Sequence, residues 1–198
     1  MSPDSGHTPS SRLIIGLTGP NAAGKGEVAA RLVSRGFTYH SLSDVLRDEL
    51  LEAGREPSRD NLIEAGNALR AAGGAGVLAE RVRRRLGGRD LVDSIRNPAE
   101  VEVLRGEAGF VLIGVEAPVE VRFARARRRG RPGDGPTLAD FEAREARENS
   151  ADPSRQQLAR TFAMADHTLI NDGTLEELHR KVDGLVVRLA GAGTAAPG

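Results

Sequence analysis

A glycine-rich stretch with one lysine, GPNAAGKGEV at residues 19–28, lies directly between an apolar run and a helical pattern. The run before it, RLIIGLTG at 12–19, predicts a buried strand. After it, apolar residues recur at helical spacing up to Gly36, a residue type typical of a helix C-terminus. A strand, a tight glycine turn and a helix in this order constrain the chain to begin with a βα unit.

The same alternation continues along the chain. Helical patterns separate four further short apolar runs, at 37–42, 89–95, 110–117 and 167–171. Strands that alternate with helices are typical of a parallel sheet covered on both faces. We therefore expect an α/β fold with five parallel strands.

Length and composition bound the function. The 198 residues suffice for one core, and we expect a single domain at 12–190 between disordered tails at 1–11 and 191–198. The 28 basic and 28 acidic residues cancel, so nothing in the charge predicts a nucleic-acid or membrane partner. Cysteine is absent and the N-terminus has no hydrophobic signal core, which favours the cytoplasm. The oligomeric state is left open.

Gly19, Gly24 and Lys25 have the spacing G-x-x-x-x-G-K, in the strand-to-helix context that this phosphate-binding motif requires. Small residues let the backbone N–H groups turn inward around a phosphate, and the helix N-terminus adds positive potential. Lys25 is expected to reach the β- and γ-phosphates of ATP. The expected nucleotide-binding residues of this loop are Gly19, Pro20, Asn21, Ala22, Ala23, Gly24, Lys25, Gly26 and Glu27.

Gly26 and Glu27 stand where such loops usually carry a serine or threonine for Mg²⁺. Glu27 is interpreted either as a first-turn acid favoured by the helix dipole or as a ligand of the metal or its water. In both cases we expect Mg²⁺ to be held mainly by phosphate oxygens and waters. Asp44 and Asp93 are the candidates for indirect ligands, and Asp93 lies near the end of a predicted strand, as a Walker-B aspartate would.

Three parts of the sequence carry a resemblance to known families. GLTGPNAAGKGEVAARLVSRGF and LSDVLRDELLEAG resemble the nucleoside monophosphate kinases. The segment ADHTLINDGTLEELHRKV is similar to dephospho-coenzyme A kinase. GNALR and DSIRNPAEVEVLR are similar to the kinase-like segment of some deoxycytidylate deaminases.

This resemblance implies a three-layer P-loop NTPase fold, with a helical acceptor-binding insertion at 43–88 and a lid region at 122–150. It implies a phosphotransferase that uses ATP and Mg²⁺ on a small-molecule acceptor. A nucleoside monophosphate is the first expectation for the acceptor, and dephospho-coenzyme A is the second. An alternative of another class is a non-catalytic module that senses ATP.

The resemblance also suggests residues for the acceptor. Asp44 would orient the acceptor or a metal-bound water, although a first-turn acid after a Ser43 cap explains it equally well. Arg47, one turn later, would clamp the acceptor's phosphate. Arg70 and Arg96 have uncharged neighbours, and Arg96 follows the third predicted strand at the sheet edge where open α/β sheets bind ligands. Lys25, Asp44 and Arg96 belong to the expected catalytic set.

An arginine-rich run, RFARARRRGRPGDGP at 122–136, completes the expected catalytic set. In a kinase lid, one or two of its arginines would neutralise the transferring phosphoryl group. Arg125 and Arg129 are one helical turn apart and are the expected pair. The alternative is a solvated basic helix.

The loop after the last predicted strand is expected to lie beside the adenine ring of ATP. Asn171 and Gly173 would offer backbone contacts there, as the resemblance implies. The alternative is a turn in which Thr174 caps the last helix, and both interpretations are compatible.

Overall fold

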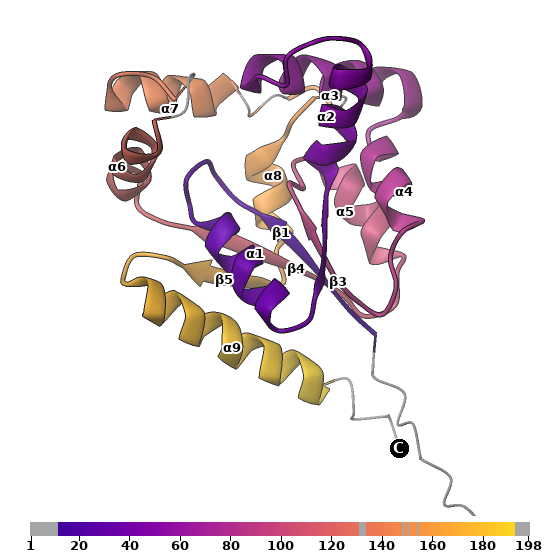
Figure 1. Cartoon of the computed structure of the whole chain (residues 1–198), viewed down its shortest axis with the longest axis vertical. Helices are drawn as coiled ribbons and strands as arrows, with labels where there is room; N and C mark the ends of the chain where they lie inside the picture. The colour runs from indigo at the N-terminus through magenta and orange to yellow at the C-terminus, as the bar shows by residue number, and fades with distance from the viewer. Residues whose placement is uncertain (1–11, 131–133, 148, 150, 154, 193–198) are drawn as a thin grey trace, which may run out of the picture.

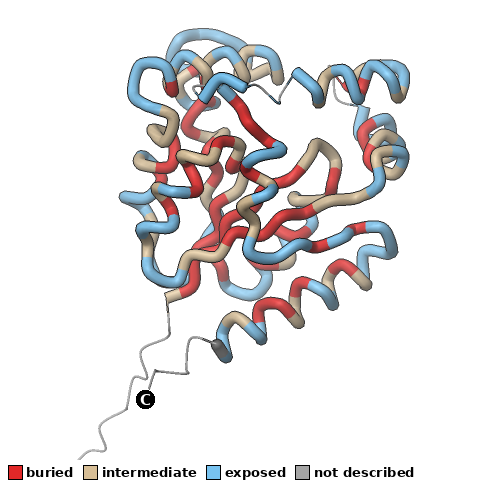
Figure 2. Tube along the Cα trace, turned by 180° about the vertical axis from the view of Figure 1, so that it is seen from behind, coloured by how far each residue is buried: buried red, intermediate tan, exposed pale blue. Residues whose placement is uncertain are grey.

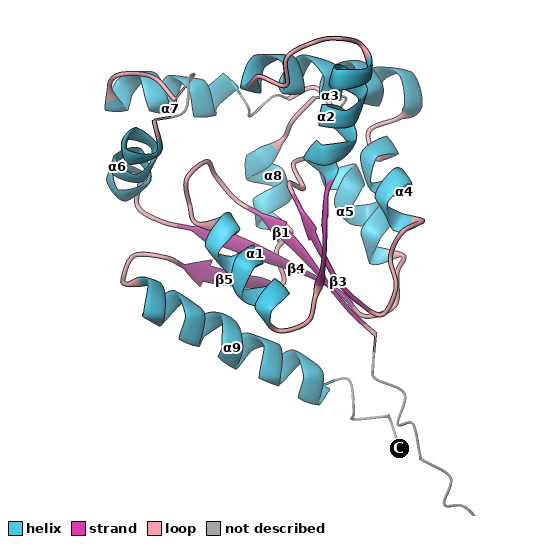
Figure 3. Ribbon diagram, viewed as in Figure 1, coloured by secondary structure: helices cyan, strands magenta, loops and turns pink. Residues whose placement is uncertain are grey.

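The computed structural model describes residues 12–192 apart from 131–133, 148, 150 and 154. Within them, five parallel strands form one sheet in the order β2-β3-β1-β4-β5. Figure 3 shows the strands in magenta, with helices around them. The strands are β1 (Leu13–Thr18), β2 (Thr38–Ser41), β3 (Arg89–Asp93), β4 (Phe110–Glu116) and β5 (His167–Ile170). The predicted α/β fold with a five-stranded parallel sheet is confirmed.

Helices connect all the strands. In the described residues they are α1 (Lys25–Ser34), α2 (Leu42–Glu52), α3 (Arg59–Gly73), α4 (Val77–Arg83), α5 (Pro98–Arg105), α6 (Val119–Arg129), α7 (Leu138–Arg147), α8 (Leu158–Ala163) and α9 (Leu175–Ala192). Three of them, α2 to α4, lie in the single crossover from β2 to β3. The predicted tails lie mostly outside the described residues, but α9 continues to residue 192, two residues past the predicted end of the domain.

Side chains of the central strand alternate between two cores. Leu13, Ile15 and Leu17 pack with α1 and α9 on one face, and Ile14 packs with α2, α4 and α5 on the other. Figure 1 shows α1 and α9 together on one side of the sheet, and Figure 2 shows the buried residues concentrated along the strands. Among the helices that the structure describes, none combines the length and the apolar character that a membrane span requires.

Two helix starts test the predicted caps. The N-cap of α2 is Ser41, whose Oγ accepts a hydrogen bond from the Ser43 amide at 3.2 Å, so the prediction of a Ser43 cap is wrong. β2 ends at Ser41, one residue before the predicted end, and α2 begins at Leu42, so the cap lies two residues before the predicted one. At α9 the Thr174 amide donates to Glu177 at 2.8 Å and the Glu177 amide donates to Thr174 Oγ1 at 3.2 Å, a capping box as expected.

One carboxylate joins the first and last helices. Asp183 on α9 accepts hydrogen bonds from Arg31 Nε of α1 at 2.9 Å and from Nε of Arg35, the C-cap of α1, at 3.0 Å. The hydrogen bonds from Arg31 and then Arg35 hold the pKa of Asp183 below its usual range. A lowered pKa in the folded state stabilises the fold above the pKa of the unfolded chain, about 3.9 for Asp. That contribution is lost as the pH falls through the folded-state value.

Replacing Asp183 by Asn is therefore expected to lower the melting temperature at neutral pH, and the difference from wild type should shrink as the pH falls below about 4. Thermal unfolding at several pH values measures it. Asp48→Asn, an exposed position on α2, is the control and should leave the melting temperature unchanged. If the melting temperature of Asp183→Asn stayed below that of the wild type by the same amount down to low pH, the stabilising role of the Asp183 charge would be contradicted.

Candidate functional site

The loop between β1 and α1 has an unusual backbone. Gly19, Ala22 and Gly24 have positive φ angles of 135°, 59° and 106°. A Cβ atom on Gly24 would lie 2.1 Å from Asn171 Nδ2, and one on Gly19 would lie 2.0 Å from the Val115 carbonyl oxygen. Only glycine fits at these two places, and the left-handed turns point successive amides to the same side.

These amides are available for a ligand. Within the described part of the chain, the N–H groups of Asn21, Ala22, Gly24 and Gly26 donate to no acceptor of the protein. They surround the N-terminus of α1, where the helix dipole adds positive potential. Unpaired amides that converge on a helix N-terminus fit a phosphate group.

The Lys25 side chain lies across this loop. Its Nζ donates to the carbonyl oxygens of Gly19 at 2.6 Å and Pro20 at 2.9 Å. A phosphate oxygen is a stronger partner for an ammonium group than a neutral carbonyl is, so these contacts can be exchanged for a ligand. Glu27 is exposed in the first turn of α1, consistent with the helix-dipole interpretation of that residue.

Asn171, at the end of β5, fastens the loop to the rest of the protein. Its Nδ2 donates to the Ala23 carbonyl at 2.8 Å, and its own backbone carbonyl accepts from Arg125 Nη2 at 3.1 Å. Arg125, predicted for the lid, thus supports the loop through Asn171, and its buried Nη1 has no hydrogen-bond partner. Gly173 lies against Glu177 in the α9 cap, so both interpretations of this loop remain open.

Two other arginines of α6 contact the loop directly. Arg129 Nη2 donates to Asn21 Oδ1 at 3.2 Å, and its role in a lid stays a prediction. Arg122, which the sequence analysis did not select, donates to the Asn21 carbonyl at 3.3 Å, is 7% exposed and pairs with Glu145. The spacing i, i+3, i+7 of Arg122, Arg125 and Arg129 places all three on one helical face, a signal that could have identified Arg122.

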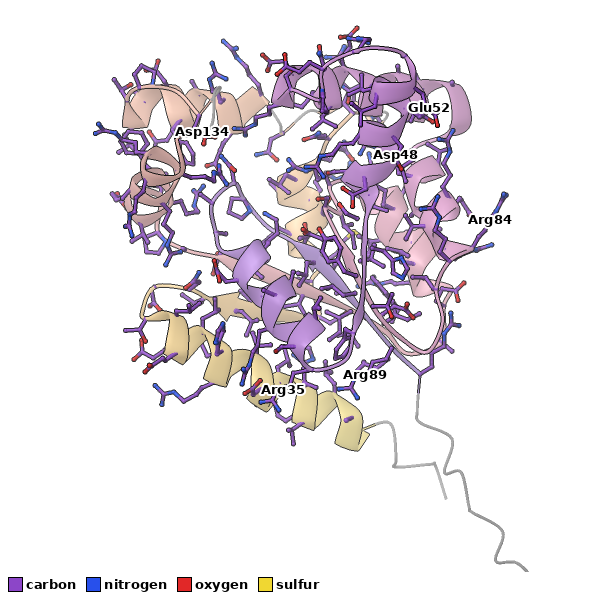
Figure 4. All side chains as sticks on the ribbon, in the orientation of Figure 1. Arg35, Asp48, Glu52, Arg84, Arg89 and Asp134 are labelled. Atoms are coloured by element: carbon purple, nitrogen blue, oxygen red, sulfur yellow. The ribbon has the colours of Figure 1, made fainter. Side chains whose placement is uncertain are left out.

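Asp134 joins the loop, α6 and α3. Its carboxylate accepts hydrogen bonds from Asn21 Nδ2 at 2.9 Å, Arg59 Nη1 at 3.1 Å and Arg129 Nη2 at 2.9 Å. Figure 4 labels it beside α6 and α7. No local pattern in the sequence identifies Asp134 or Arg59, because their contacts come from three separate segments.

A pocket lies between the inserted helices and the end of β3. Its volume is about 430 Å³, counted with the space at its open mouth. Its polar residues include Arg70 and Arg96 from the predicted acceptor set, and Ser94, which has a positive φ of 67°. The lining residues are Leu42, Ser43, Leu46, Arg59, Leu62, Ile63, Arg70, Leu78, Ser94, Arg96 and Gln156.

Arg70 is a buried cation with one carboxylate partner. Its side chain is 2% exposed, and its Nη2 and Nε donate to Glu100 Oε1 at 2.7 and 3.0 Å. The other Glu100 oxygen accepts from the backbone amides of Arg96 and Asn97 at 2.9 and 3.1 Å. Arg70 Nη1 is buried without a hydrogen-bond partner, so this guanidinium keeps one unused donor.

Asp44 and Arg47 lie elsewhere. They form an ion pair with each other, with 49% and 46% of their side chains exposed, and neither lines the pocket. This arrangement agrees with the interpretation of Asp44 as a first-turn acid of α2. Their roles toward an acceptor or a metal stay predictions.

Asp93, the residue compared with a Walker-B aspartate, is the last residue of β3. Register pairs Gly16 with Val92, so Asp93 ends β3 beside the end of β1. Its Oδ1 accepts from the Ser94 amide at 2.6 Å and its Oδ2 accepts from Tyr39 Oη at 3.3 Å. The described residues contain no group of three or more His, Cys, Asp or Glu that could hold a metal.

Comparisons with known proteins agree with this architecture. The AAA domain family matches residues 15–150. A UPF0200 protein of Hyperthermus butylicus is 34% identical over 186 residues, which cover 92% of this chain and 97% of that protein. Another UPF0200 protein, of Thermococcus gammatolerans, is 34% identical and covers 89% of this chain and 95% of its own length.

Solved structures share the fold. TT1252 from Thermus thermophilus matches 90% of this chain and 98% of its own, with 25% identity and a TM-score of 0.58. Shikimate kinase from Bacteroides thetaiotaomicron matches 89% and 99%, with 14% identity and a TM-score of 0.59. A putative kinase from Chloroflexus aurantiacus matches 94% and 100%, with 20% identity and a TM-score of 0.57. At 14% and 20% identity, the two kinases show the fold alone.

Tyr39, the only tyrosine of the chain, reports on Asp93. Partial burial and then the charge of Asp93 raise the pKa of Tyr39 to about 12, although 43% of the residue is exposed. We expect no phenolate absorbance at pH 10, where a free tyrosine is about half ionised. Asp93→Asn should move the titration to lower pH, whereas Asp140→Asn should not. Ionisation near pH 10 in the wild type, or an unchanged titration in Asp93→Asn, would contradict the contact.

Glu100→Gln should strongly destabilise the fold, because it leaves the Arg70 guanidinium buried without its counter-charge. We expect the free energy of unfolding to fall by about 3–5 kcal/mol, measured by urea denaturation. The control is Glu102→Gln on the same helix, whose side chain is 65% exposed. Equal stability of the two variants would show that the buried pair is not needed.

Proposed function

The chain belongs to the UPF0200 family and carries an AAA domain with a P-loop kinase fold, and on this premise we propose that it is an ATP-dependent phosphotransferase for a small anionic acceptor. One observation carries the proposal: the phosphate loop and the arginine-lined pocket are bridged by a single carboxylate. Asp134 accepts from Asn21 of the loop and from Arg59, which lines the pocket. A donor phosphate and an acceptor would therefore be close neighbours.

On the donor side, the loop amides and Lys25 would bind the β- and γ-phosphates of ATP. Arg129 and Arg122 approach the loop from α6 and would neutralise charge that develops during transfer. Asp93 would orient Mg²⁺, directly or through water. When bound, Mg²⁺ supplies charge neutralisation between the β- and γ-phosphates.

On the acceptor side, the pocket combines an apolar wall with cationic groups. Leu62, Ile63 and Leu78 suit an apolar body, and the unpaired Nη1 of Arg70 together with Arg96 suits an anionic group. Glu100 already neutralises the charge of Arg70, so one anionic group of the acceptor is enough to balance the charge of Arg96. These features support an acceptor with a ring or chain and one phosphate.

Among the described residues that line the pocket, none is a carboxylate, and this bears on the kind of acceptor group that we propose. Transfer to a hydroxyl uses a base to accept its proton, commonly an aspartate. A phosphate oxygen is already ionised at neutral pH and needs no base. With Asp44 paired to Arg47 on the outer side of α2, the pocket therefore supports a nucleoside monophosphate over the hydroxyl of dephospho-coenzyme A.

The test is ADP production from ATP and Mg²⁺ with a panel of ribo- and deoxynucleoside monophosphates, with dephospho-coenzyme A, and without an acceptor. We expect stimulation by one nucleoside monophosphate. Stimulation by dephospho-coenzyme A alone would identify that molecule as the acceptor in place of a nucleoside monophosphate. ATP binding without stimulation by any acceptor would favour a nucleotide sensor.

In that assay Lys25→Ala should reduce acceptor-dependent ADP production by about 100- to 1000-fold, because it removes the mobile charge at the transferring phosphate. Its melting temperature should stay close to that of the wild type, since the Lys25 ammonium donates to the carbonyls of Gly19 and Pro20 in its own loop and these can turn to water. Arg84→Ala removes one exposed charge at the far edge of the molecule and is the control (Figure 4). Unchanged turnover in Lys25→Ala would defeat the assignment of the loop.

A further inference from the structure

The environment of Asp134 is that of a bound anion. The residue is 7% exposed, and its two carboxylate oxygens receive donors from Asn21, Arg59 and Arg129 within 3.1 Å. Two guanidinium groups and an amide that converge on one carboxylate form the set of donors that a phosphate group would use. The protein itself supplies the negative charge that holds these donors together.

The two arginines come from opposite sides of the site. Arg129 of α6 also donates to Asn21 Oδ1 at 3.2 Å, so its guanidinium contacts the phosphate loop. Arg59 begins α3 and lines the acceptor pocket. Among the described carboxylates, Asp134 thus pairs both with Arg129, which contacts the loop, and with Arg59, which lines the pocket.

We propose that Asp134 is a positioning residue that substitutes for phosphate in the substrate-free protein, and that a bound polyphosphate takes over its arginines. The proposal rests on the proposed function, since it assumes that phosphates bind at the loop. A polyphosphate offers more oxygens and more negative charge than one carboxylate, so it competes well for Arg129. Asp134 left beside it would be repelled by a like charge.

This exchange of partners would couple the binding of the donor to the binding of the acceptor. While Asp134 holds Arg59 and Arg129 together, a ligand on either side must compete with it for an arginine. The first ligand to displace Asp134 breaks its contacts with both arginines, so the second ligand binds without competition from this carboxylate. Donor and acceptor would then bind with positive coupling, even though each ligand alone binds more weakly.

The test is calorimetric binding of inorganic tripolyphosphate to the whole protein, without acceptor and without divalent metal. Asp134→Asn keeps the shape and one oxygen but removes the charge, and it should bind tripolyphosphate about 5- to 50-fold more tightly than the wild type. Asp134→Glu retains the charge and should stay near the wild-type affinity. Asp60→Asn, beside Arg59 on α3 and exposed, is the charge-matched control and should not change.

Other outcomes overturn the proposal. Equal affinity of Asp134→Asn and the wild type would show that Asp134 does not compete with phosphate, and weaker binding would make it a supporting contact. Weaker binding only when Mg²⁺ is added would make it a metal ligand instead. Binding to none of the proteins would defeat the proposed function as well, which separates the two failures. Asp134→Ala, which should also bind more tightly, replaces Asp134→Asn if that variant does not fold.

Discussion

The close approach of the loop backbone to β4 and β5 is the constraint on which the site depends. Gly19 lies against the carbonyl of Val115, and Gly24 lies against the amide of Asn171, at distances that leave no room for a side chain. Because Asn171 also binds the Ala23 carbonyl, the loop is held in one shape before any ligand arrives. Amides that are already oriented need no rearrangement when a phosphate binds.

The parallel sheet brings the rest of the site to this loop. All five strands end at the same edge, so the loop after β1, Asp93 at the end of β3 and Asn171 after β5 become neighbours although they are distant in the chain. Helix α6 follows β4 and adds arginines from one side. The crossover helices α2 to α4 enclose the pocket on the other side. The two halves meet at Asp134, which belongs to neither the loop nor the pocket but binds residues of both.

The sequence predicted the fold and the phosphate loop because both are local patterns. Alternating apolar runs give the strands, and glycine and lysine spacing gives the loop. Contacts that depend on the assembled fold were not predictable in this way. Arg59 and Asp134 meet across 75 residues, and Glu100 neutralises Arg70 from 30 residues away. The choice of Asp44 followed a resemblance alone, and the structure pairs that residue with Arg47 outside the pocket.

The most direct test of the account is a crystal structure of the protein with Mg²⁺ and a non-hydrolysable ATP analogue. The account predicts that the β-phosphate lies within hydrogen-bonding distance of the amides of residues 21–26, with Lys25 turned from its own loop carbonyls toward the phosphates. It also predicts that Arg129 contacts a phosphate in place of Asp134. A nucleotide bound elsewhere, or one whose phosphates point away from the loop, would contradict the account.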